Sequence, residues 1–466
     1  MPKPHDSLGT VASISRRQFI RYTTVATTAF AVSGPYIVRG QNLNSRLQVG
    51  IIGAGGKGSS DTDETAKAGG VIVGLCDVDR GTLESRGKKY SDAKRYQDFR
   101  KMLAEMEKDI DAVVVATPDH THAPASIMAM KMKKHCFCQK PLTHSVAEAR
   151  MMRDVAKRMK VATQMGNQGS SGDGLRRAVE VIQAGIIGKP QQLHVWSNRP
   201  VWPQGQARPE GSDPVPDNLD WDLWLGPAPV RPYKKSAYHS FAWRGVQDFG
   251  TGALGDMACH TVNMPFRALK LGYPTEVEAE STGMNNESWP LSSKIRFQFP
   301  KRDGLPPLTF WWYDGAPDGK QTYRPHADIT TDIVAKQGKL PGSGCLIIGD
   351  KGRIFSPDDY GSQFFVRMND EKELKAAKDH EAVKAIPNNI WRSPGHYVEW
   401  IDAIKGGRAA YSNFDIAAYL TEIILLGCVA LRAGTKLEWD GPKMRAKNNK
   451  AAAQFVKRDY RDGWKL

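Results

Sequence analysis

The residues best suited to acid–base chemistry are an aspartate and a histidine four positions apart, in the segment DFGTGALGDMACHTVN at 248–263. Residues at this spacing share one face of a helix, and we expect Asp256 to begin that helix as its N-cap. A carboxylate one turn from an imidazole can orient the ring and raise its basicity, which favours a general base near neutral pH. Asp256 and His260 are therefore predicted to be catalytic. The alternative is a capping aspartate followed by a buried structural histidine.

A lysine in the first half of the chain is a candidate for the same reaction. Lys140 lies in the run Cys138-Gln139-Lys140-Pro141, where a strand is predicted to end. An ammonium group fixed ahead of a proline can hydrogen-bond and polarise a substrate hydroxyl or carbonyl. Lys140 is predicted to be both catalytic and cofactor-binding, and Gln139 to be cofactor-binding. The alternative for Lys140 is a surface lysine in a loop.

A glycine-rich turn is the candidate for holding a cofactor. The stretch VGIIGAGGKG at 49–58 reads as a strand followed by a turn, with Gly53, Gly55 and Gly58 in G-x-G-x-x-G spacing. This spacing is typical of a tight turn, a close approach of pyrophosphate to the backbone, and close packing of the next helix on its strand. The helix N-terminus would then face the phosphates. Ordinary turns are the alternative, because the chain contains 44 glycines.

An aspartate at the end of the second predicted strand strengthens the cofactor interpretation. Asp77 lies about twenty residues beyond the glycine turn, where a carboxylate can accept hydrogen bonds from both ribose hydroxyls of a dinucleotide. Because a carboxylate there also repels a 2′-phosphate, the sequence favours NAD over NADP. Arg80 nearby keeps NADP open. A solvated carboxylate at a strand end is the alternative for Asp77.

Two histidines follow the next apolar run, at 112–116. They lie in Thr117-Pro118-Asp119-His120-Thr121-His122, a turn expected at the carboxyl edge of the sheet, where open α/β sheets bind their ligands. Either histidine could instead cap a helix that begins near Ala123. The residues predicted here to contact the cofactor are Thr117, Pro118, His120 and His122.

The elements that must position these residues alternate between strands and helices. Such alternation is typical of an α/β fold with a doubly wound parallel sheet, here an N-terminal Rossmann domain at 46–168. Its strands are predicted at 48–52, 71–76, 112–116, 135–138 and 161–164.

The composition changes after residues 165–169, which predicts a second domain at 169–440 and a basic, solvated C-terminal tail at 441–466. A helix is expected at 175–184, and late helices at 395–407 and 415–431. The polar insertion at 315–342 has no predicted role. The strands of this domain are predicted at 192–198, 277–282, 293–299, 308–313, 345–349 and 352–356.

The segment 199–244 is irregular and rich in proline and aromatic residues. Aromatic faces beside polar groups suit sugar rings, whose C–H faces stack while their hydroxyls form hydrogen bonds. The alternative is that these aromatic residues pack a long loop onto the domain. The residues predicted to bind a substrate are Asn167, Trp202, Trp243, Arg244 and His260.

The first 45 residues are predicted to be a signal and linker that take no part in the fold. Ser15-Arg16-Arg17-Gln18-Phe19-Ile20 precedes a weakly apolar run at 22–32, with Ala29-Phe30-Ala31 as a small-residue cleavage site. This combination resembles a twin-arginine export signal, which predicts a periplasmic or otherwise exported protein without membrane association after cleavage. A short amphipathic helix that begins with two arginines is the alternative. No other run approaches the ~20 apolar residues that span a bilayer.

The composition is ordinary for a globular protein, with 40% hydrophobic and 25% charged residues. The formal net charge of +15 is spread along the chain without a nucleic-acid-binding motif, so we expect a solvated basic surface and no nucleic-acid partner. The six cysteines show no zinc spacing and are expected to be buried free thiols. No metal site is predicted.

Together these motifs resemble the glucose–fructose oxidoreductase and inositol dehydrogenase family, Gfo/Idh/MocA. The glycine turn, Asp77, the 117–122 segment and Lys140 match its pattern, which also has an Asp and a His four apart, as at 256 and 260. Most members have Glu-Lys-Pro where this chain has Gln139-Lys140-Pro141. The resemblance implies an α/β Rossmann domain followed by an α+β domain with an open, mostly antiparallel sheet. This sheet is expected to form the substrate side of the site and an oligomer interface. A homo-oligomer, dimer or tetramer, is therefore expected.

The resemblance implies an NAD(P)-dependent oxidoreductase that acts on a sugar, polyol or glycoside hydroxyl. The export signal adds the expectation of a tightly bound cofactor, because free nicotinamide cofactor should be scarce outside the cytosol. Two other classes stay open. One is a glycoside hydrolase or lyase that uses NAD for transient ring oxidation, and the other is a non-catalytic sugar- or cofactor-sensing protein.

Overall fold

The computed structural model describes residues 46–315 and 323–466. The predicted twin-arginine signal lies outside the described residues, as do positions 316–322 of the polar insertion. The described part of that insertion contains the helix α11, Ala327–Gln337, which was not among the expected elements.

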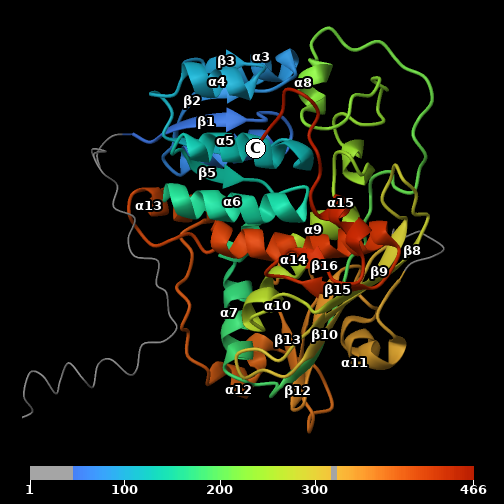
Figure 1. Cartoon of the computed structure of the whole chain (residues 1–466). Helices are drawn as coiled ribbons and strands as arrows, with labels where there is room; N and C mark the ends of the chain where they lie inside the picture. Colours follow the sequence, from blue (N-terminus) through green and yellow to red (C-terminus); the bar gives the residue numbers. More distant parts are fainter. Residues whose placement is uncertain (1–45, 316–322) are drawn as a thin grey trace, which may run out of the picture. The chain divides into compact units, whose positions relative to one another are not determined.

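The first half forms a six-stranded sheet in the order β3-β2-β1-β4-β5-β6, and every neighbouring pair is parallel. The apolar runs are buried on both faces, as strands of a parallel sheet covered by helices must be (Figure 1). The predicted doubly wound α/β fold is confirmed. The strands are β1 Gln48–Ile52, β2 Val71–Cys76, β3 Lys94–Tyr96, β4 Ala112–Val115, β5 His135–Cys138 and β6 Thr163–Met165.

Helices connect these strands, and local sequence fixes several of their ends. The side chain of Ser145 accepts a hydrogen bond from the backbone N–H of Glu148, whose carboxylate accepts one from the Ser145 N–H, so α6 begins with a capping box. Asp79 and Asp98 cap α3 and α4 in the same position. The helices are α2 Lys57–Lys67, α3 Arg80–Lys89, α4 Phe99–Glu105, α5 Asp119–Lys131, α6 Val146–Met159, η1 Gln168–Ser171 and α7 Asp173–Gln183.

The second half builds a ten-stranded sheet in the order β14-β13-β12-β11-β7-β10-β9-β8-β15-β16. Its neighbours are antiparallel except for β7 and β10, so the predicted mostly antiparallel sheet is confirmed. The strands are β7 Pro190–Trp196, β8 Glu276–Thr282, β9 Ser292–Phe299, β10 Leu308–Tyr313, β11 Gly344–Gly349, β12 Gly352–Ser356, β13 Phe365–Met368, β14 Lys375–Ala376, β15 Leu437–Asp440 and β16 Arg445–Ala446.

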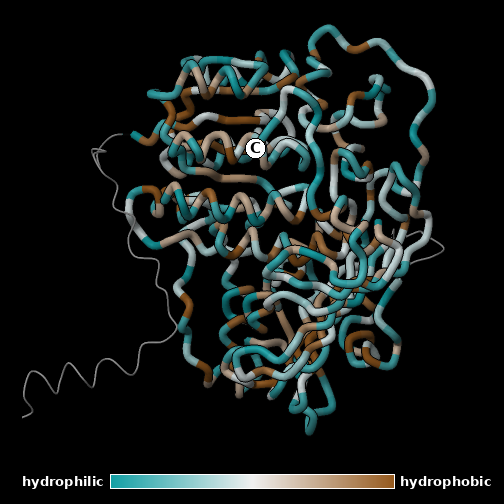
Figure 2. Tube along the Cα trace, in the orientation of Figure 1, coloured by the Kyte–Doolittle hydropathy of each residue, from teal (hydrophilic) through white to brown (hydrophobic). Residues whose placement is uncertain are grey.

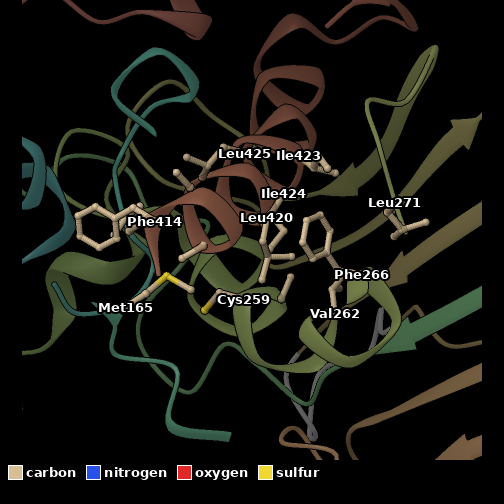
Figure 3. Close-up of a cluster of buried hydrophobic side chains, with 14 of the residues drawn as sticks. Met165, Cys259, Val262, Phe266, Leu271, Phe414, Leu420, Ile423, Ile424 and Leu425 are labelled. Carbon is tan, nitrogen blue, oxygen red and sulfur yellow. The ribbon is translucent and has the colours of Figure 1, made fainter. Parts of the chain in front are cut away.

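One long helix, α14 (Phe414–Ala433), joins the two halves, because it contacts α6 on one side and α9 and β8 on the other. Its Leu420 and Ile424 face Cys259, Val262 and Phe266 in one hydrophobic cluster (Figure 3). The remaining helices are α8 Trp221–Leu225, η2 Ala242–Gly245, α9 Gly252–Thr261, α10 Asn263–Ala268, η3 Ala377–Asp379, α12 Glu381–Lys384, α13 His396–Ile404, η4 Lys450–Ala452 and α15 Ala453–Val456.

Helix α14 corrects the expectation that no run after the signal approaches a membrane-spanning length. It is long and apolar enough to cross a bilayer, but 83% of its most apolar window is buried inside the protein. The central helix of a folded core meets the same length and composition test. Figure 2 shows the hydrophobic colours gathered on the sheet strands and inner helices, while the long loop after β7 is mostly hydrophilic.

Most basic residues of the C-terminal tail are exposed, as its charge predicted, but Arg458 and Arg461 are partly buried. Arg458 donates to the carboxylate of Glu148 at 2.8 Å, and its side chain is only 15% exposed. The ring of Trp464 packs beside Phe99 of the N-terminal domain. The charge therefore indicated exposure for most of the tail, but not for Arg458, which forms a specific contact. The six cysteines are all buried and free, as predicted.

Candidate active site

The glycine turn is shaped by steric contacts that no other residue would tolerate. Gly53 has φ +84°, and a Cβ there would lie 2.7 Å from the carbonyl oxygen of Ala116. A Cβ at Gly58 would lie 1.8 Å from the carbonyl oxygen of Gly53, so α2 packs directly on the turn. Gly55 leaves the backbone open toward a cavity. The turn thus has the shape that a pyrophosphate group requires.

Asp77 stands beside this turn at the end of β2. Its carboxylate accepts hydrogen bonds from the backbone N–H of Gly55 at 2.9 Å and of Asp79 at 3.1 Å. Burial raises the pKa of Asp77 to about 6, although these backbone hydrogen bonds oppose the shift. The carboxylate is therefore mostly ionised at neutral pH and can accept hydroxyl donors.

A cavity of about 670 Å³ begins at the glycine turn and Asp77 and extends to Lys140. This volume is within the range of small-molecule sites. Segments far apart in the sequence line it, including the C-terminal Trp464. The predicted site residues on its wall are Gly53, Gly55, Asp77, Thr117, Pro118, Gln139, Lys140, Trp243, Arg244 and Asp256.

At the far end of the cavity, Lys140 and Asp256 form a buried ion pair. The Lys140 Nζ lies 2.9 Å from Asp256 Oδ1, and Arg244 Nε lies 3.5 Å from the same oxygen. Burial lowers the pKa of Lys140, but the attraction of Asp256 and neighbouring groups outweighs it and raises the pKa. Burial has the opposite effect on Asp256, whose pKa is nevertheless lowered by Lys140 and Arg244. The lysine is therefore held protonated and the aspartate ionised.

The geometry corrects two predictions about Asp256 and His260. Helix α9 begins at Gly252, so Asp256 lies within the helix and is not its N-cap. The Asp256 carboxylate pairs with Lys140, while Nδ1 of His260 is buried without a hydrogen-bond partner among the described residues. Burial first, then the charge of Lys140, lower the pKa of His260 to about 3. The charge of Asp256 raises the pKa of His260, but burial and the charge of Lys140 outweigh this effect, so His260 is a neutral imidazole at physiological pH.

Five other predicted residues lie off the cavity wall. His120 and His122 are buried in α5 and contact backbone carbonyl oxygens, those of Trp224 and of Pro141 among them, and neither caps the helix. Trp202 donates to the side chain of Gln204, and Asn167 donates to the Cys259 carbonyl. Gly58 acts through packing alone. His260 is likewise absent from this wall and packs edge-to-face on Tyr360, with ring centroids 5.0 Å apart.

Sequence reasoning missed Asp119 and Trp224 as cavity residues. Asp119 lies in the 117–122 turn and accepts a 2.8 Å hydrogen bond from the Thr251 hydroxyl. Burial, with Asp256 as the next cause, raises its pKa to about 7. Its acidic side chain in an edge turn was the available signal.

Trp224 belongs to a cluster of aromatic residues that packs the 199–244 loop onto Phe249, so the packing alternative holds for this tryptophan.

The amide at position 139 has a structural explanation. Gln139 Nε2 donates to Asp61 Oδ2 at 2.8 Å, and Asp61 is fully buried. Tyr397 donates to the other carboxylate oxygen at 2.6 Å, and Lys57 pairs with that oxygen. Because Asp61 supplies the carboxylate, a donor rather than a second acid is required at 139.

We predict that Gln139→Glu destabilises the protein by about 1–3 kcal/mol near pH 8, because two buried carboxylates would meet. The pKa of the introduced carboxyl group would be raised in the folded state, so the folded state binds an extra proton and the loss shrinks as the pH falls. Urea denaturation at two pH values measures this. Gln454→Glu at an exposed site is the matched control, and adding Asp61→Asn should restore stability. Equal losses in the 139 and 454 variants would contradict the explanation.

A parallel sheet with a glycine turn, a carboxylate at the end of β2 and a cavity closed by a second domain defines a dinucleotide-binding Rossmann protein. The family descriptions that match are "Oxidoreductase family, NAD-binding Rossmann fold" over residues 47–167 and "Oxidoreductase family, C-terminal alpha/beta domain" over residues 174–304. The chain belongs to the Gfo/Idh/MocA oxidoreductase family.

Two curated relatives are inositol dehydrogenases. Inositol 2-dehydrogenase of Salmonella typhimurium is 29% identical over 152 residues, which are 32% of this chain and 45% of the relative. Myo-inositol 2-dehydrogenase of Thermotoga maritima is 28% identical over 158 residues, 34% of this chain and 47% of the relative. The chain thus matches about half the length of these relatives.

Solved structures share the fold at lower identity. A WlbA dehydrogenase from Bordetella pertussis, in complex with NADH and UDP-GlcNAcA, has a TM-score of 0.59 at 15% identity and covers 85% of this chain and 99% of its own. An inositol dehydrogenase homologue from Azotobacter vinelandii, in complex with NADH and myo-inositol, has a TM-score of 0.55 at 14% identity, with coverages of 85% and 98%.

Proposed function

We propose that this protein is an NAD-dependent oxidoreductase acting on a CH–OH group of a sugar, polyol or glycoside, with a tightly held cofactor. One observation carries the proposal. A single cavity connects Asp77, suited to a ribose, with the Lys140–Asp256 ion pair, suited to a reacting hydroxyl. The curated relatives that are inositol dehydrogenases support the substrate class.

The residues present fit NAD. Gly53 and Gly55 leave room for the pyrophosphate at the N-terminus of α2, and the Asp77 carboxylate faces the cavity for the ribose hydroxyls. The guanidinium of Arg80 donates to the Asp217 carbonyl oxygen and is not directed at a 2′-phosphate. NAD is therefore preferred to NADP. When bound, NAD supplies a nicotinamide ring that accepts hydride from the carbon bearing the hydroxyl.

Lys140 is the side chain placed to act on the substrate oxygen. Its ammonium, held charged by Asp256, would donate a hydrogen bond to the hydroxyl and stabilise the negative charge that develops on the oxygen. His260 lies off the cavity wall and its pKa is lowered to about 3, so it is a weak proton acceptor, and the hydroxyl proton would pass to solvent. Phe241 and Trp243, stacked on Arg244, would form the sugar-facing wall.

The test measures first whether the purified protein contains or binds the cofactor, and then whether it turns over a substrate. Purified protein should contain nicotinamide nucleotide by mass spectrometry or bind added NAD, and should produce NADH from at least one member of a panel of inositols, pyranoses and glycosides. Protein that neither contains nor binds NAD would overturn the proposal. Net glycosidic cleavage without net NADH would instead establish the NAD-assisted hydrolase class, and binding without any turnover would favour the sensing class.

Asp77→Asn should raise the Kd for NAD about tenfold at neutral pH, because two charge-assisted hydrogen bonds to the ribose are weakened. In the wild type, affinity should also fall as the pH drops through about 6, since a protonated Asp77 cannot accept from both hydroxyls. Calorimetric titrations between about pH 5 and pH 8 measure both effects. Asp92→Asn, at an exposed position, is the control. A wild-type Kd that does not change with pH would rule out this role.

We further propose export by the twin-arginine route, supported by the paired arginines and small-residue site at 15–31, and assembly into a dimer or tetramer, supported by the family resemblance. Replacing both arginines by lysine should retain the protein in the cytosol of an expressing bacterium. Light scattering of the purified protein gives its oligomeric state.

A further inference from the structure

The last residues of the chain contribute an aromatic wall to the cofactor cavity. After α15 the chain runs back along the N-terminal domain (Figure 1), and Trp464 lines the same cavity as Asp77 and Lys140. The Trp464 ring lies 6.0 Å from that of Phe99, and the Arg100 guanidinium carbon lies 4.4 Å from its centroid. The indole ring is thus fixed by contacts at the start of α4.

Three residues before Trp464 anchor this segment. Arg458 Nε donates to Glu148 Oε1 at 2.8 Å, and the Tyr460 hydroxyl bonds to the same oxygen. Arg461 Nη1 lies 2.6 Å from Asp222 Oδ1, and its Nε donates to the Gly226 carbonyl at 2.5 Å. These contacts tie the segment to α6 and to the 199–244 loop. The position of Trp464 is therefore specified by its neighbours and is not that of a free end.

Position along the cavity identifies which part of the cofactor Trp464 would meet. In this fold the pyrophosphate lies at the glycine turn and the adenosine ribose at Asp77, while Lys140 marks the reacting end. The adenine must therefore extend beyond Asp77, away from Lys140. The cavity residues on that side are Val78, Gln97, Phe99 and Trp464.

We propose that Trp464 forms the adenine-binding wall of the NAD site, and that residues 457–466 act as a strap that retains the cofactor. The proposal rests on the proposed function, since it assumes that NAD occupies this cavity. An aromatic ring beside a base stabilises it by stacking, whatever the base. Because the strap crosses the adenine end, its contacts with Glu148 and Asp222 must open before the nucleotide leaves on that side.

The experiment compares full-length wild type with Trp464→Ala, Trp464→Phe and Phe455→Ala. Phe455 is an aromatic residue of α15, just before the strap, that packs on Arg432 and does not line the cavity, so it is the matched control. Titration calorimetry uses NAD, AMP and nicotinamide mononucleotide, and stopped-flow fluorescence gives the NAD dissociation rate.

Trp464→Ala should raise the Kd of NAD and of AMP about tenfold and speed NAD dissociation similarly, while leaving nicotinamide mononucleotide unchanged. Trp464→Phe and Phe455→Ala should stay close to wild type. Equal AMP affinity in wild type and Trp464→Ala, or equal losses for AMP and nicotinamide mononucleotide, would overturn the adenine wall but leave the proposed function intact. A wild type that binds neither NAD nor AMP would overturn the proposed function itself.

Discussion

Lys140→Met should lower kcat by about 10²- to 10⁴-fold while leaving the Kd for NAD within a few-fold of wild type. The side chain is the charged donor at the reacting end of the cavity, and methionine keeps its length without its charge. The adenosine half of the site, at Asp77, is distant along the cavity and should be unaffected. Steady-state kinetics with the best substrate of the panel, together with NAD titration, measure the split between turnover and binding.

Lys131→Met is the matched control, because Lys131 is an exposed residue at the end of α5. Its kinetics should equal those of wild type. Asp256→Asn should also reduce kcat, since the ammonium loses the partner that holds it charged and in place. A Lys140→Met enzyme that binds NAD and turns over at more than about a third of the wild-type rate would show that Lys140 has no role in the reaction.

Local patterns predicted the elements of the fold because each depends on neighbours in sequence. The strand at 48–52 and its glycine turn follow from an apolar run and the spacing of Gly53, Gly55 and Gly58, and the structure places them as expected. The ten-stranded sheet order could not be predicted, since β15 pairs with β8 across about 160 residues of sequence. Such long-range pairing leaves no local signal.

The sequence predicted part of the residues that line the cavity, but not which of them pair. The i, i+4 spacing of Asp256 and His260 indicated an interaction within one helix, yet Asp256 pairs with Lys140, 116 positions earlier. The carboxylate pairs with Lys140 and not with His260, because a buried carboxylate is stabilised more by an ammonium than by a neutral imidazole. Within the C-terminal tail, the partial burial of Arg458 could not be predicted for a related reason, since its partner Glu148 lies 310 positions away.

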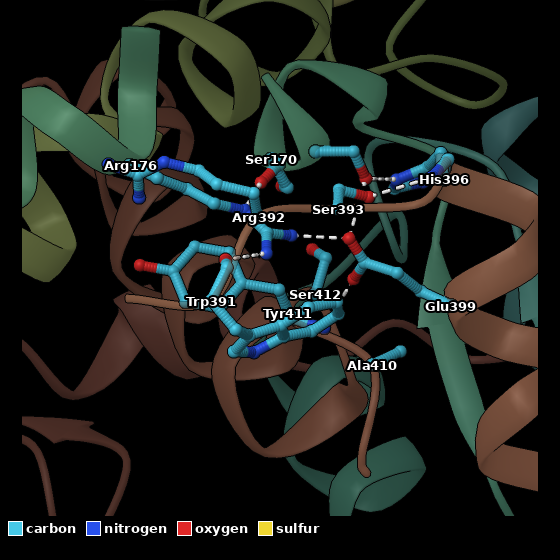
Figure 4. A network of polar contacts seen from close by, with 12 residues as sticks. Ser170, Arg176, Trp391, Arg392, Ser393, His396, Glu399, Ala410, Tyr411 and Ser412 are labelled. Atoms are coloured by element: carbon cyan, nitrogen blue, oxygen red, sulfur yellow. Dashed lines mark hydrogen bonds and ion pairs between the residues drawn. The ribbon is translucent and has the colours of Figure 1, made fainter. Parts of the chain in front are cut away.

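The buried ion pair between Arg176 and Glu399 gives the largest expected change in stability. Both side chains are fully buried, and Arg176 also donates to the carbonyl oxygens of Ser170 at 3.0 Å and Trp391 at 2.7 Å (Figure 4). Its guanidinium lies 4.4 Å from the ring centroid of Tyr411. These contacts join α7 to α13 and to the loop before α14.

Arg176→Met should destabilise the protein by about 3–5 kcal/mol, because Glu399 would remain as a buried, unpaired charge. The loss should be partly restored by adding Glu399→Gln, which removes that charge and keeps an acceptor for the backbone N–H of Tyr411. Arg158→Met, at an exposed position on α6, should stay within about 0.5 kcal/mol of wild type. Urea denaturation of the three variants measures the differences. If the double variant were less stable than Arg176→Met alone, the cost would come from lost packing of the guanidinium between Trp391 and Tyr411 rather than from the unpaired carboxylate.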